Sequence, residues 1–345
     1  MATTNSVYKA FTSDDIVTAN PSEVTTGLWI PGDTGSLSSF YTSSAQVATL
    51  SGQFYYNIYN VNPDVTSSAN IQFAVAYGNV SGSGAPTLTQ NSNATLSTLA
   101  TYFQYKNILL DSGESVFTFA NSYVPQHFFV INIERAALRQ TLDPGNFQIT
   151  LSGSGGAYTF IDDSGQTLSA TAGKSGNVFN VVMGTLTGPS GSTITSASSA
   201  THGGFGLVYP EIGIILLNPD ALVEVGACAA PVTSSNVNNQ YNHAKLLTSL
   251  QLGQSFQARS SEVISSTHYF VRLGNKEFNY SNNPTFSNQT TGALINSDFI
   301  QDPHVYPTTI GLYNDNNELL AVAKLSAPQE KMFSSEILLS IRLDW

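Results

Sequence analysis

Five histidines are the residues of this chain best suited to binding a metal or moving a proton near neutral pH. They are scattered along the sequence as His127, His202, His243, His268 and His304. No two of them have the two- or four-residue spacing that places a pair of imidazoles on one metal from a single element. The single cysteine, Cys228, can form neither a disulfide framework nor a cysteine-based metal site. The sequence therefore predicts no metal and no cofactor.

The catalytic patterns that can be searched for are incomplete. Gly173-Lys174-Ser175 is similar to the end of a phosphate-binding loop, but Leu168 stands where that loop requires a glycine. No serine lies in a Gly-x-Ser-x-Gly turn. Asp162 and Asp163 are adjacent, so in a strand they face opposite sides and cannot act as the paired acid and base of a glycosidase. Entry into a hairpin is the better interpretation of this pair, and we expect no enzyme activity.

Two other groups of residues leave a binding role open. The stretch from Asn314 to Glu318 offers oxygen ligands for a weak calcium site, but it lacks the glycine and the distant glutamate of an EF-hand. Turn formation is the favoured interpretation. The aromatic residues between Tyr55 and Tyr77 could line a groove that stacks sugars, but residues of this kind more often fill the core of a β-sandwich.

The charge of the chain argues against general nucleic-acid binding. Only 10% of the 345 residues are charged and the net charge is −11, while the hydrophobic fraction of 41% is ordinary. No Lys or Arg lies between Lys9 and Lys106. Phosphate binding needs clustered cations, and most of the chain offers none. A small basic patch built from Arg259, Arg272 and Lys276 is the one alternative.

The elements expected to position these residues are mainly β. In residues 1–155, short alternating stretches such as 54–59, 71–77 and 128–133 are separated by Asn, Asp, Gly and Pro turns, which favours an antiparallel β-sandwich. A helix is expected around Leu96, Leu99, Phe103 and Lys106, with Asn93 as its cap, and a helical turn over residues 135–140. The fold class is therefore mainly β, with antiparallel β-sandwich domains and a few short helices.

The remaining sequence suggests two further regions. Residues 156–231 are rich in Gly, Ser and Thr and contain a strand into a turn at 158–165, a linker-like stretch at 190–199 and a strand pair over 205–217. Asn218-Pro219-Asp220 is expected to cap a short helix. Residues 232–345 begin with an amphipathic helix that includes Tyr241, Leu247 and Leu250. We expect domains over residues 1–155, 156–231 and 232–345.

The last part of the chain has the clearest pattern. Residues 309–325 are two apolar runs around an Asn/Asp cluster, which predicts a hairpin. From Ile337 to Trp345, apolar and polar residues alternate, so all the apolar side chains lie on one face of a strand. No basic segment followed by an apolar one occurs in residues 1–26, and no apolar run is long enough for a bilayer, so neither a signal peptide nor membrane insertion is expected.

Several segments also resemble a known group of proteins. The stretches FNYSNNPTF (278–286), TTIGLYNDNNELLAVAKLS (308–326) and RLDW (342–345) look like the C-terminal region of virion structural proteins of large contractile-tailed bacteriophages, in particular the marine and cyanophage type. The resemblance extends upstream through residues 32–37, 105–119, 142–153 and 208–219. It implies a structural virion component, and the family carries no catalytic residues.

The expected function is therefore assembly of a phage particle, in the tail or baseplate, with synthesis in the host cytoplasm. The expected partners are other virion proteins and copies of the same chain, because polar but uncharged surfaces lose little hydration energy in contacts and strand edges can extend a neighbour's sheet. A neck or capsid-associated position, or a module that binds a host-surface glycan, are the alternatives. The residues expected to define contacts or the fold are Phe278, Asn279, Tyr280, Asn282, Asn283, Pro284, Phe286, Leu343 and Trp345.

Overall fold

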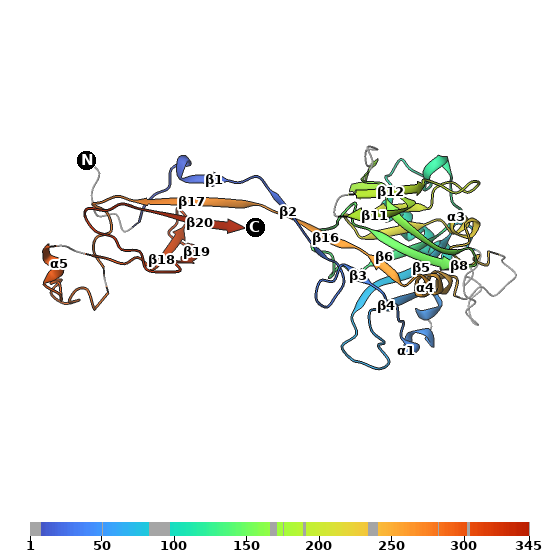
Figure 1. The fold of residues 1–345 in the computed structure, drawn as a ribbon, viewed down its shortest axis with the longest axis horizontal. Helices are drawn as coiled ribbons and strands as arrows, with labels where there is room; N and C mark the ends of the chain where they lie inside the picture. Colours follow the sequence, from blue (N-terminus) through green and yellow to red (C-terminus); the bar gives the residue numbers. More distant parts are fainter. Residues whose placement is uncertain are drawn as a thin grey trace. The chain divides into compact units, whose positions relative to one another are not determined.

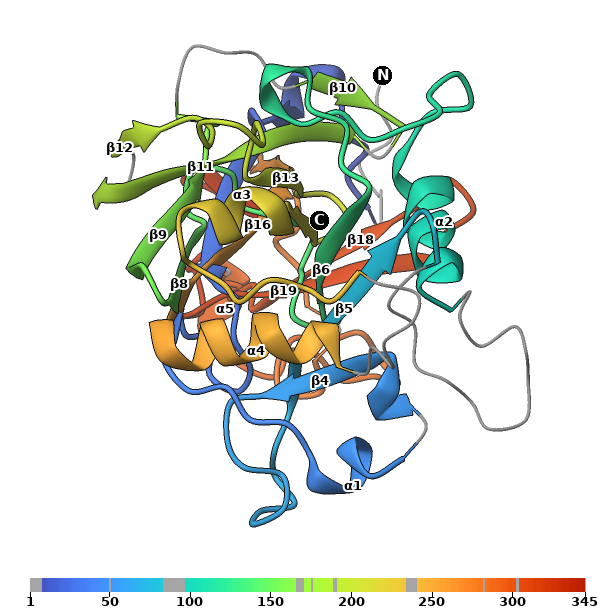
Figure 2. The same ribbon diagram turned by 90° about the vertical axis from the view of Figure 1, so that its right-hand side faces the viewer.

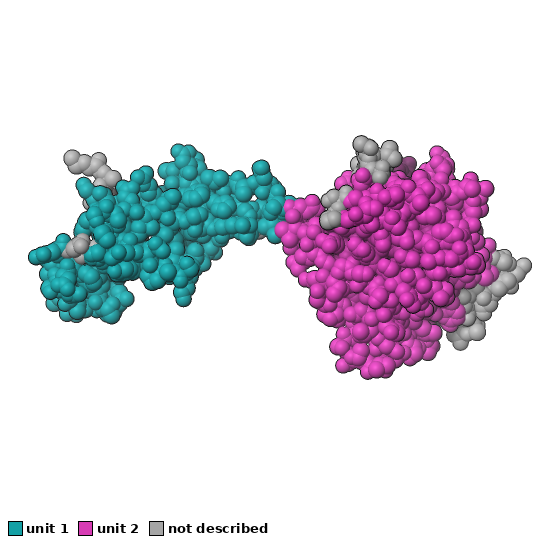
Figure 3. Space-filling view, in the orientation of Figure 1, with its two compact units in different colours: residues 1–22, 263–345 teal, residues 23–262 magenta. Residues whose placement is uncertain are grey.

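A computed structural model describes residues 8–49, 51–82, 97–165, 171–174, 176–188, 191–233, 241–281, 283–301 and 304–344. The chain is divided into two compact units (Figure 3). Unit 1 consists of residues 1–22 and 263–345, and unit 2 consists of residues 23–262. Segments from both ends of the sequence therefore share unit 1. This division differs from the three consecutive domains that the sequence suggested.

Most of unit 2 is antiparallel β-structure, and its elements are coloured along the sequence in Figure 1. The strands are β2 (Ser22–Gly27), β3 (Ser36–Leu37), β4 (Tyr55–Tyr59), β5 (Ile71–Asn79), β6 (His127–Ile133), β7 (Thr141–Leu142), β8 (Gln148–Gly153), β9 (Gly156–Asp162), β10 (Thr171–Gly173), β11 (Gly176–Gly188), β12 (Gly191–Ser196), β13 (Gly206–Tyr209), β14 (Ile214–Leu217), β15 (Ser255–Gln257) and β16 (Arg259–Ile264). The helices are α1 (Ser44–Val47), α2 (Ser97–Leu109), α3 (Pro219–Glu224) and α4 (Asn242–Gly253), with 3-10 turns at Ser51–Gln53 and Ala120–Ser122. The expected mainly β class with a few short helices is confirmed.

Twelve strands of unit 2 belong to one sheet, whose main path runs β3-β15-β8-β9-β11-β13-β14-β6-β5-β4, while β10 and β12 both pair with β11. The sheet curves so strongly that residues near its two ends come into contact. The ring of Phe73 on β5 lies 5.4 Å from that of Phe256 on β15, and Trp29 lies 4.7 Å from the same Phe256 ring. The expected arrangement of the strands as a sandwich of two facing sheets is not clearly shown.

The central strands β6 and β14 are apolar on both faces because each face meets a different core. Phe129, Ile131 and Ile215 point into the larger core inside the curved sheet. Phe128 and Leu216 point to the opposite face, into a second core that α2 covers. Continuous apolar runs are what a strand buried on both faces requires.

The helix expected near residue 100 exists as α2, but its buried face is not the expected one. Tyr102, Tyr105 and Leu109 are buried, whereas Phe103 is exposed. Tyr102 stacks on Phe128 of β6 at 5.0 Å between ring centroids, which fixes this orientation. The expected cap, Asn93, lies outside the described residues.

Helix α4 packs against β8, β5 and β4 and so closes one side of the curved sheet (Figure 2). Leu247 and Leu250 are buried as the amphipathic pattern predicted, together with His243. The Nε2 atom of His243 lies 3.1 Å from the carbonyl oxygen of Gly52, and burial lowers the pKa of this imidazole to about 4. His243 is therefore a neutral core residue.

Unit 1 is smaller and has a thin core. It contains a 3-10 turn (Ser13–Asp15), β1 (Ile16–Thr18), β17 (Ser266–Leu273), α5 (Asp298–Gln301), β18 (Thr309–Tyr313), β19 (Leu319–Lys324) and β20 (Ile337–Asp344). The order β1-β17-β20 forms one antiparallel sheet, and β18 and β19 form a hairpin. Leu312 of the hairpin packs with Val271, Leu339 and Ile341 of the sheet. The predicted hairpin and the alternating C-terminal strand are both present.

Other local predictions were wrong where long-range pairing decides the structure. The stretch expected to be a linker contains β12, which pairs with β11. The expected helical turn at 135–140 is a turn closed by the hydrogen bond from Ala137 N to Glu134 O, and no helix is assigned there. The expected domain boundary after residue 155 falls between β8 and β9, two paired strands. Composition changes at these places, but the hydrogen-bonded sheet continues through them.

Candidate functional site

The segment with the most specific sequence pattern, residues 278–286, forms an irregular loop of unit 1 that is held by its own side chains. Phe278 adopts φ +54 and packs against the core between the hairpin and the sheet. The Asn279 amide donates to the carbonyl oxygen of Asn275 at 2.7 Å, and its Oδ1 accepts from Lys331 Nζ at 2.9 Å. This loop is therefore tied to the segment around residue 331.

The second half of the loop is a turn around a small aromatic cluster. The Asn283 side chain accepts from the backbone N–H of Thr285, and Pro284 is exposed in the same turn. Phe286 is buried, stacks on Phe299 and meets the ring edge of Tyr280. Asn282 lies outside the described residues. These contacts are intramolecular, so the described side chains of this segment shape the loop.

The C-terminal strand β20 presents one face to the core of unit 1. Leu339 and Ile341 are buried and Leu343 packs against them, while Leu338 is 64% exposed on the opposite face. β17 is the one strand that pairs with β20 among the described residues. β20 is therefore an edge strand with its other side available for hydrogen bonding. Trp345 lies outside the described residues.

Unit 1 also carries an apolar surface on the outer side of the β18–β19 hairpin. Leu320 is 68% exposed, and Tyr313, Leu319 and Val322 are also exposed. More than half of the large exposed apolar side chains in the described residues belong to unit 1, although this unit holds less than a third of the chain. We call Tyr313, Leu319, Leu320 and Val322 the hairpin patch. Apolar surface gathered in this way is typical of contact regions.

The side chains of the possible calcium site at residues 314–318 form hydrogen bonds within their own turn. Asn314 Oδ1 accepts from the backbone N–H groups of Asn316 and Glu318, and the Glu318 carboxylate accepts from the Asn314 amide. Arg272, a member of the possible basic patch, is paired with Glu336. Within the described ranges, no three His, Cys, Asp or Glu side chains converge as metal ligands.

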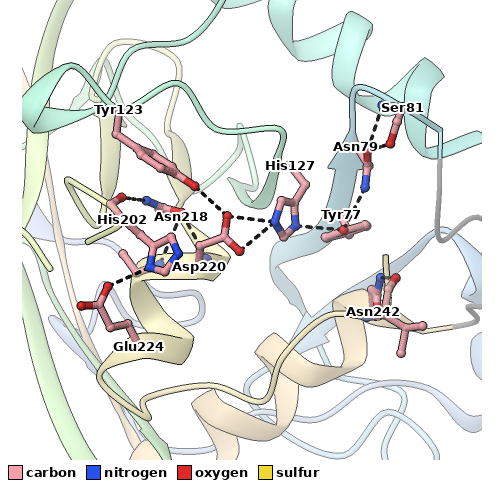
Figure 4. A network of polar contacts seen from close by, with 12 residues as sticks. Tyr77, Asn79, Ser81, Tyr123, His127, His202, Asn218, Asp220, Glu224 and Asn242 are labelled. Carbon is pink, nitrogen blue, oxygen red and sulfur yellow. Dashed lines mark hydrogen bonds and ion pairs between the residues drawn. The ribbon is translucent and has the colours of Figure 1, made fainter. Parts of the chain in front are cut away.

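A polar network in unit 2 brings together residues that are far apart in the sequence (Figure 4). Helix α3 begins as predicted, with the Asn218 side chain accepting from the N–H groups of Asp220 and Ala221. Asp220 and Glu224 are four residues apart and so lie on one face of this helix. Asp220 faces His127 at the start of β6, and Glu224 faces His202 in the loop before β13.

The distances assign a role to each group of the network. His127 Nε2 lies 3.1 Å from both carboxylate oxygens of Asp220, and its Nδ1 lies 2.9 Å from the hydroxyl of Tyr77. The tautomer with its hydrogen on Nε2 satisfies both contacts, because Nε2 donates a hydrogen bond to Asp220 and Nδ1 accepts one from the Tyr77 hydroxyl. The Tyr123 hydroxyl donates to Asp220 at 2.9 Å. His202 Nδ1 lies 2.8 Å from Glu224 Oε2.

The protonation states of the network suit a structural role. The hydrogen bond from His127 lowers the pKa of Asp220, and the hydrogen bond from His202 lowers the pKa of Glu224 to about 2. Burial raises the pKa of Tyr77, and burial with the Asp220 hydrogen bond raises the pKa of Tyr123 to about 12. Neither the acids nor the tyrosines are therefore poised to exchange protons near pH 7.

Access points to the same conclusion. The His127 side chain is 7% exposed, and both of its ring nitrogens are engaged with side chains of the network. The network holds helix α3 and the loop at residues 199–204 against β6. The sequence predicted the cap of α3 but gave no signal for the two His–carboxylate pairs, because each pair depends on long-range packing.

In the parts of the chain that the structure describes, the helices are all too short or too polar to span a lipid bilayer. Comparison with known proteins finds no matching protein family, no matching curated protein and no matching solved structure. The function is therefore inferred from the residues and their geometry.

Proposed function

We propose that this chain is a structural component of a bacteriophage virion, placed in the tail or baseplate, that acts through contacts with other virion proteins and with copies of itself. The observation that carries the proposal is the apolar surface of unit 1, above all the hairpin patch, beside the exposed edge of β20. The resemblance of residues 278–286, 308–326 and 342–345 to virion proteins names the kind of particle.

The chemistry of the surface favours this function. Few charges must lose water when such a surface is covered, because only 10% of the residues are charged. Apolar side chains such as Leu320 and Val322 gain free energy when a partner covers them. The proposal assigns no catalytic role to the chain and no contact with nucleic acid.

The test is particle assembly with a variant of the hairpin patch. L320D/V322D places two carboxylates on the exposed face of β19. Leu320 and Val322 are exposed there and do not belong to the core of unit 1. We expect purified particles from a phage carrying L320D/V322D to contain at least about tenfold less of this chain by quantitative mass spectrometry. K324D, on the same strand, is the control and should be incorporated normally. Normal incorporation of L320D/V322D would refute the role of the patch, and absence of the native chain from purified particles would refute the proposed function.

A second candidate function is binding to the host surface. It is favoured by the exposed aromatic rings of Tyr280, Tyr306 and Phe333 in the loops of unit 1, since such rings stack on sugars. Purified chain that binds whole host cells, and loses that binding in Y306A/F333A, would support this function over a purely internal position. A neck or capsid-associated position predicts no binding to cells, and its symmetry in the particle would distinguish it from the baseplate.

A further inference from the structure

The free edge of β20 has a charge pattern that is complementary to itself. On the exposed face of this strand, Glu336 lies near its beginning and Arg342 and Asp344 lie near its end. Each end is already a charge pair, since Arg272 Nη2 lies 2.6 Å from Glu336 and Arg342 Nε lies 2.7 Å from Asp344. An antiparallel copy of the strand brings the two ends together.

We propose that two copies of this chain pair through β20, antiparallel and about a two-fold axis at Leu339. This register places Glu336 of each copy opposite Arg342 of the other, Ile337 opposite Ile341, and Leu339 opposite itself. The two sheets then form one continuous sheet with strand order β1-β17-β20-β20-β17-β1. The inference deepens the proposed function, on which its biological meaning rests, by naming one partner and the surface it uses.

The pattern of residues selects this register among the neighbouring ones. The apolar side chains of both copies lie on the same side of the joined sheet only when the two-fold axis passes through a residue. The possible registers therefore differ in which residue of β20 lies on the axis. An axis at Ser340 places Glu336 opposite Asp344, two like charges. An axis at Leu338 places Glu336 opposite Ser340 and Arg342 opposite Ser334, and an axis at Ile341 places Arg342 opposite Ser340 and leaves Glu336 outside the paired segment. Among the axes from Leu338 to Ile341, only the one at Leu339 pairs opposite charges at both ends. Opposite charges across strands are stabilising, whereas like charges are destabilising.

The paired ends form longer rows of alternating charge. In the dimer, Glu336 would lie between Arg272 of its own copy and Arg342 of the other, and that Arg342 would in turn contact Asp344. The four side chains are all at least partly exposed in the single chain and free to make these contacts. On the opposite face, Leu339 and Ile341 extend the apolar core of each unit 1 across the two-fold axis.

Reversal of single charges tests the register, although each reversal also breaks one ion pair within its own copy, Arg272–Glu336 or Arg342–Asp344. E336R opposes two arginines at each end of the dimer, and R342E opposes two glutamates. Sedimentation velocity of the full chain over a dilution series should show a dimer, and each single variant should raise its Kd by about tenfold or more. K324E, an exposed charge reversal on β19, is the control and should leave the Kd unchanged.

Mixing the two variants gives the decisive result. An E336R copy and an R342E copy form opposite-charge pairs at both ends, so an equimolar mixture should form heterodimers with a Kd within about threefold of the native value. A variant that simply failed to fold could not be rescued in this way. A monomeric native chain, unchanged single variants, or no rescue on mixing would each overturn the inference. A chain that is monomeric but present in virions would overturn it and leave the proposed function standing.

Discussion

Single side chains stabilise the irregular part of unit 1, and Lys331 is the clearest case. Its residue surface is 0% exposed, and its ammonium donates to Asn279 Oδ1 at 2.9 Å, to Met332 O at 3.0 Å and to Asn275 O at 3.1 Å. A buried charge of this kind is tolerated because three oxygens replace the water that it has lost. Lys331 therefore links the loop at residues 275–279 to its own segment.

Replacing Lys331 by methionine is expected to loosen this region. K331M keeps the length of the side chain but leaves the three oxygens without their donor, which costs about 1–3 kcal/mol. The free energy of opening, measured by hydrogen exchange of peptides from residues 263–344, should fall by that amount. K324M removes an exposed lysine and should leave the exchange unchanged. Equal exchange in K331M and the native chain would show that Lys331 does not hold the loops.

The network around Asp220 predicts a dependence of stability on pH. Because its pKa is lowered in the folded state, its charge stabilises the fold above the ordinary pKa, and this contribution is lost as the pH falls through the folded value. Glu224, whose pKa is lowered to about 2, acts in the same direction. Acid therefore weakens the attachment of helix α3.

D220N tests this dependence. The amide cannot accept the same charged hydrogen bonds from His127 and Tyr123, so the free energy of unfolding at pH 7 should fall by about 2 kcal/mol. The difference from the native chain should narrow as the pH falls below the ordinary pKa of an aspartate and through the lowered pKa of folded Asp220, because the native carboxylate becomes protonated there. Urea denaturation at a series of pH values measures both effects. D111N, at an exposed aspartate, is the control, and a difference that does not narrow in acid would contradict the assignment.

At the scale of elements, the alternation of β20 separates its two faces. Ile341 is buried in the small core with Leu312 and Leu339, while Ser340 is exposed. I341A should destabilise unit 1 by about 2–4 kcal/mol, because it leaves a cavity in a core with few other members. S340A should change stability by less than about 0.5 kcal/mol. Hydrogen exchange of β17 peptides measures both, and equal effects of the two substitutions would contradict the observed orientation of the strand.

The same elements explain what the sequence can and cannot predict. The hairpin at Thr309–Lys324, strand β20 and the Asn218 cap were predictable, because each depends on neighbours along the chain. Strand β12 was not, because its Gly and Ser residues form a strand only through pairing with β11. The contacts of His127 with Asp220 and of Lys331 with Asn279 join residues far apart in sequence, and a single sequence gives no signal for them.

At the scale of the whole molecule, the two units differ in the size of their cores and in their exposed apolar surface. Unit 2 has an extensive core on both faces of its sheet. Unit 1 combines a thin core with the hairpin patch and the edge of β20. A small unit of this kind gains stability when partners cover its apolar surface. We therefore expect unit 1 to be the part of the chain that makes the principal assembly contacts.

A density map of the intact particle tests this account most directly. The account predicts that the chain occupies symmetry-related positions in the tail or baseplate, with Leu320 and Val322 of unit 1 covered by a neighbouring protein. Particles in which the chain has no density, or in which the hairpin patch faces open solvent at every position, would contradict it.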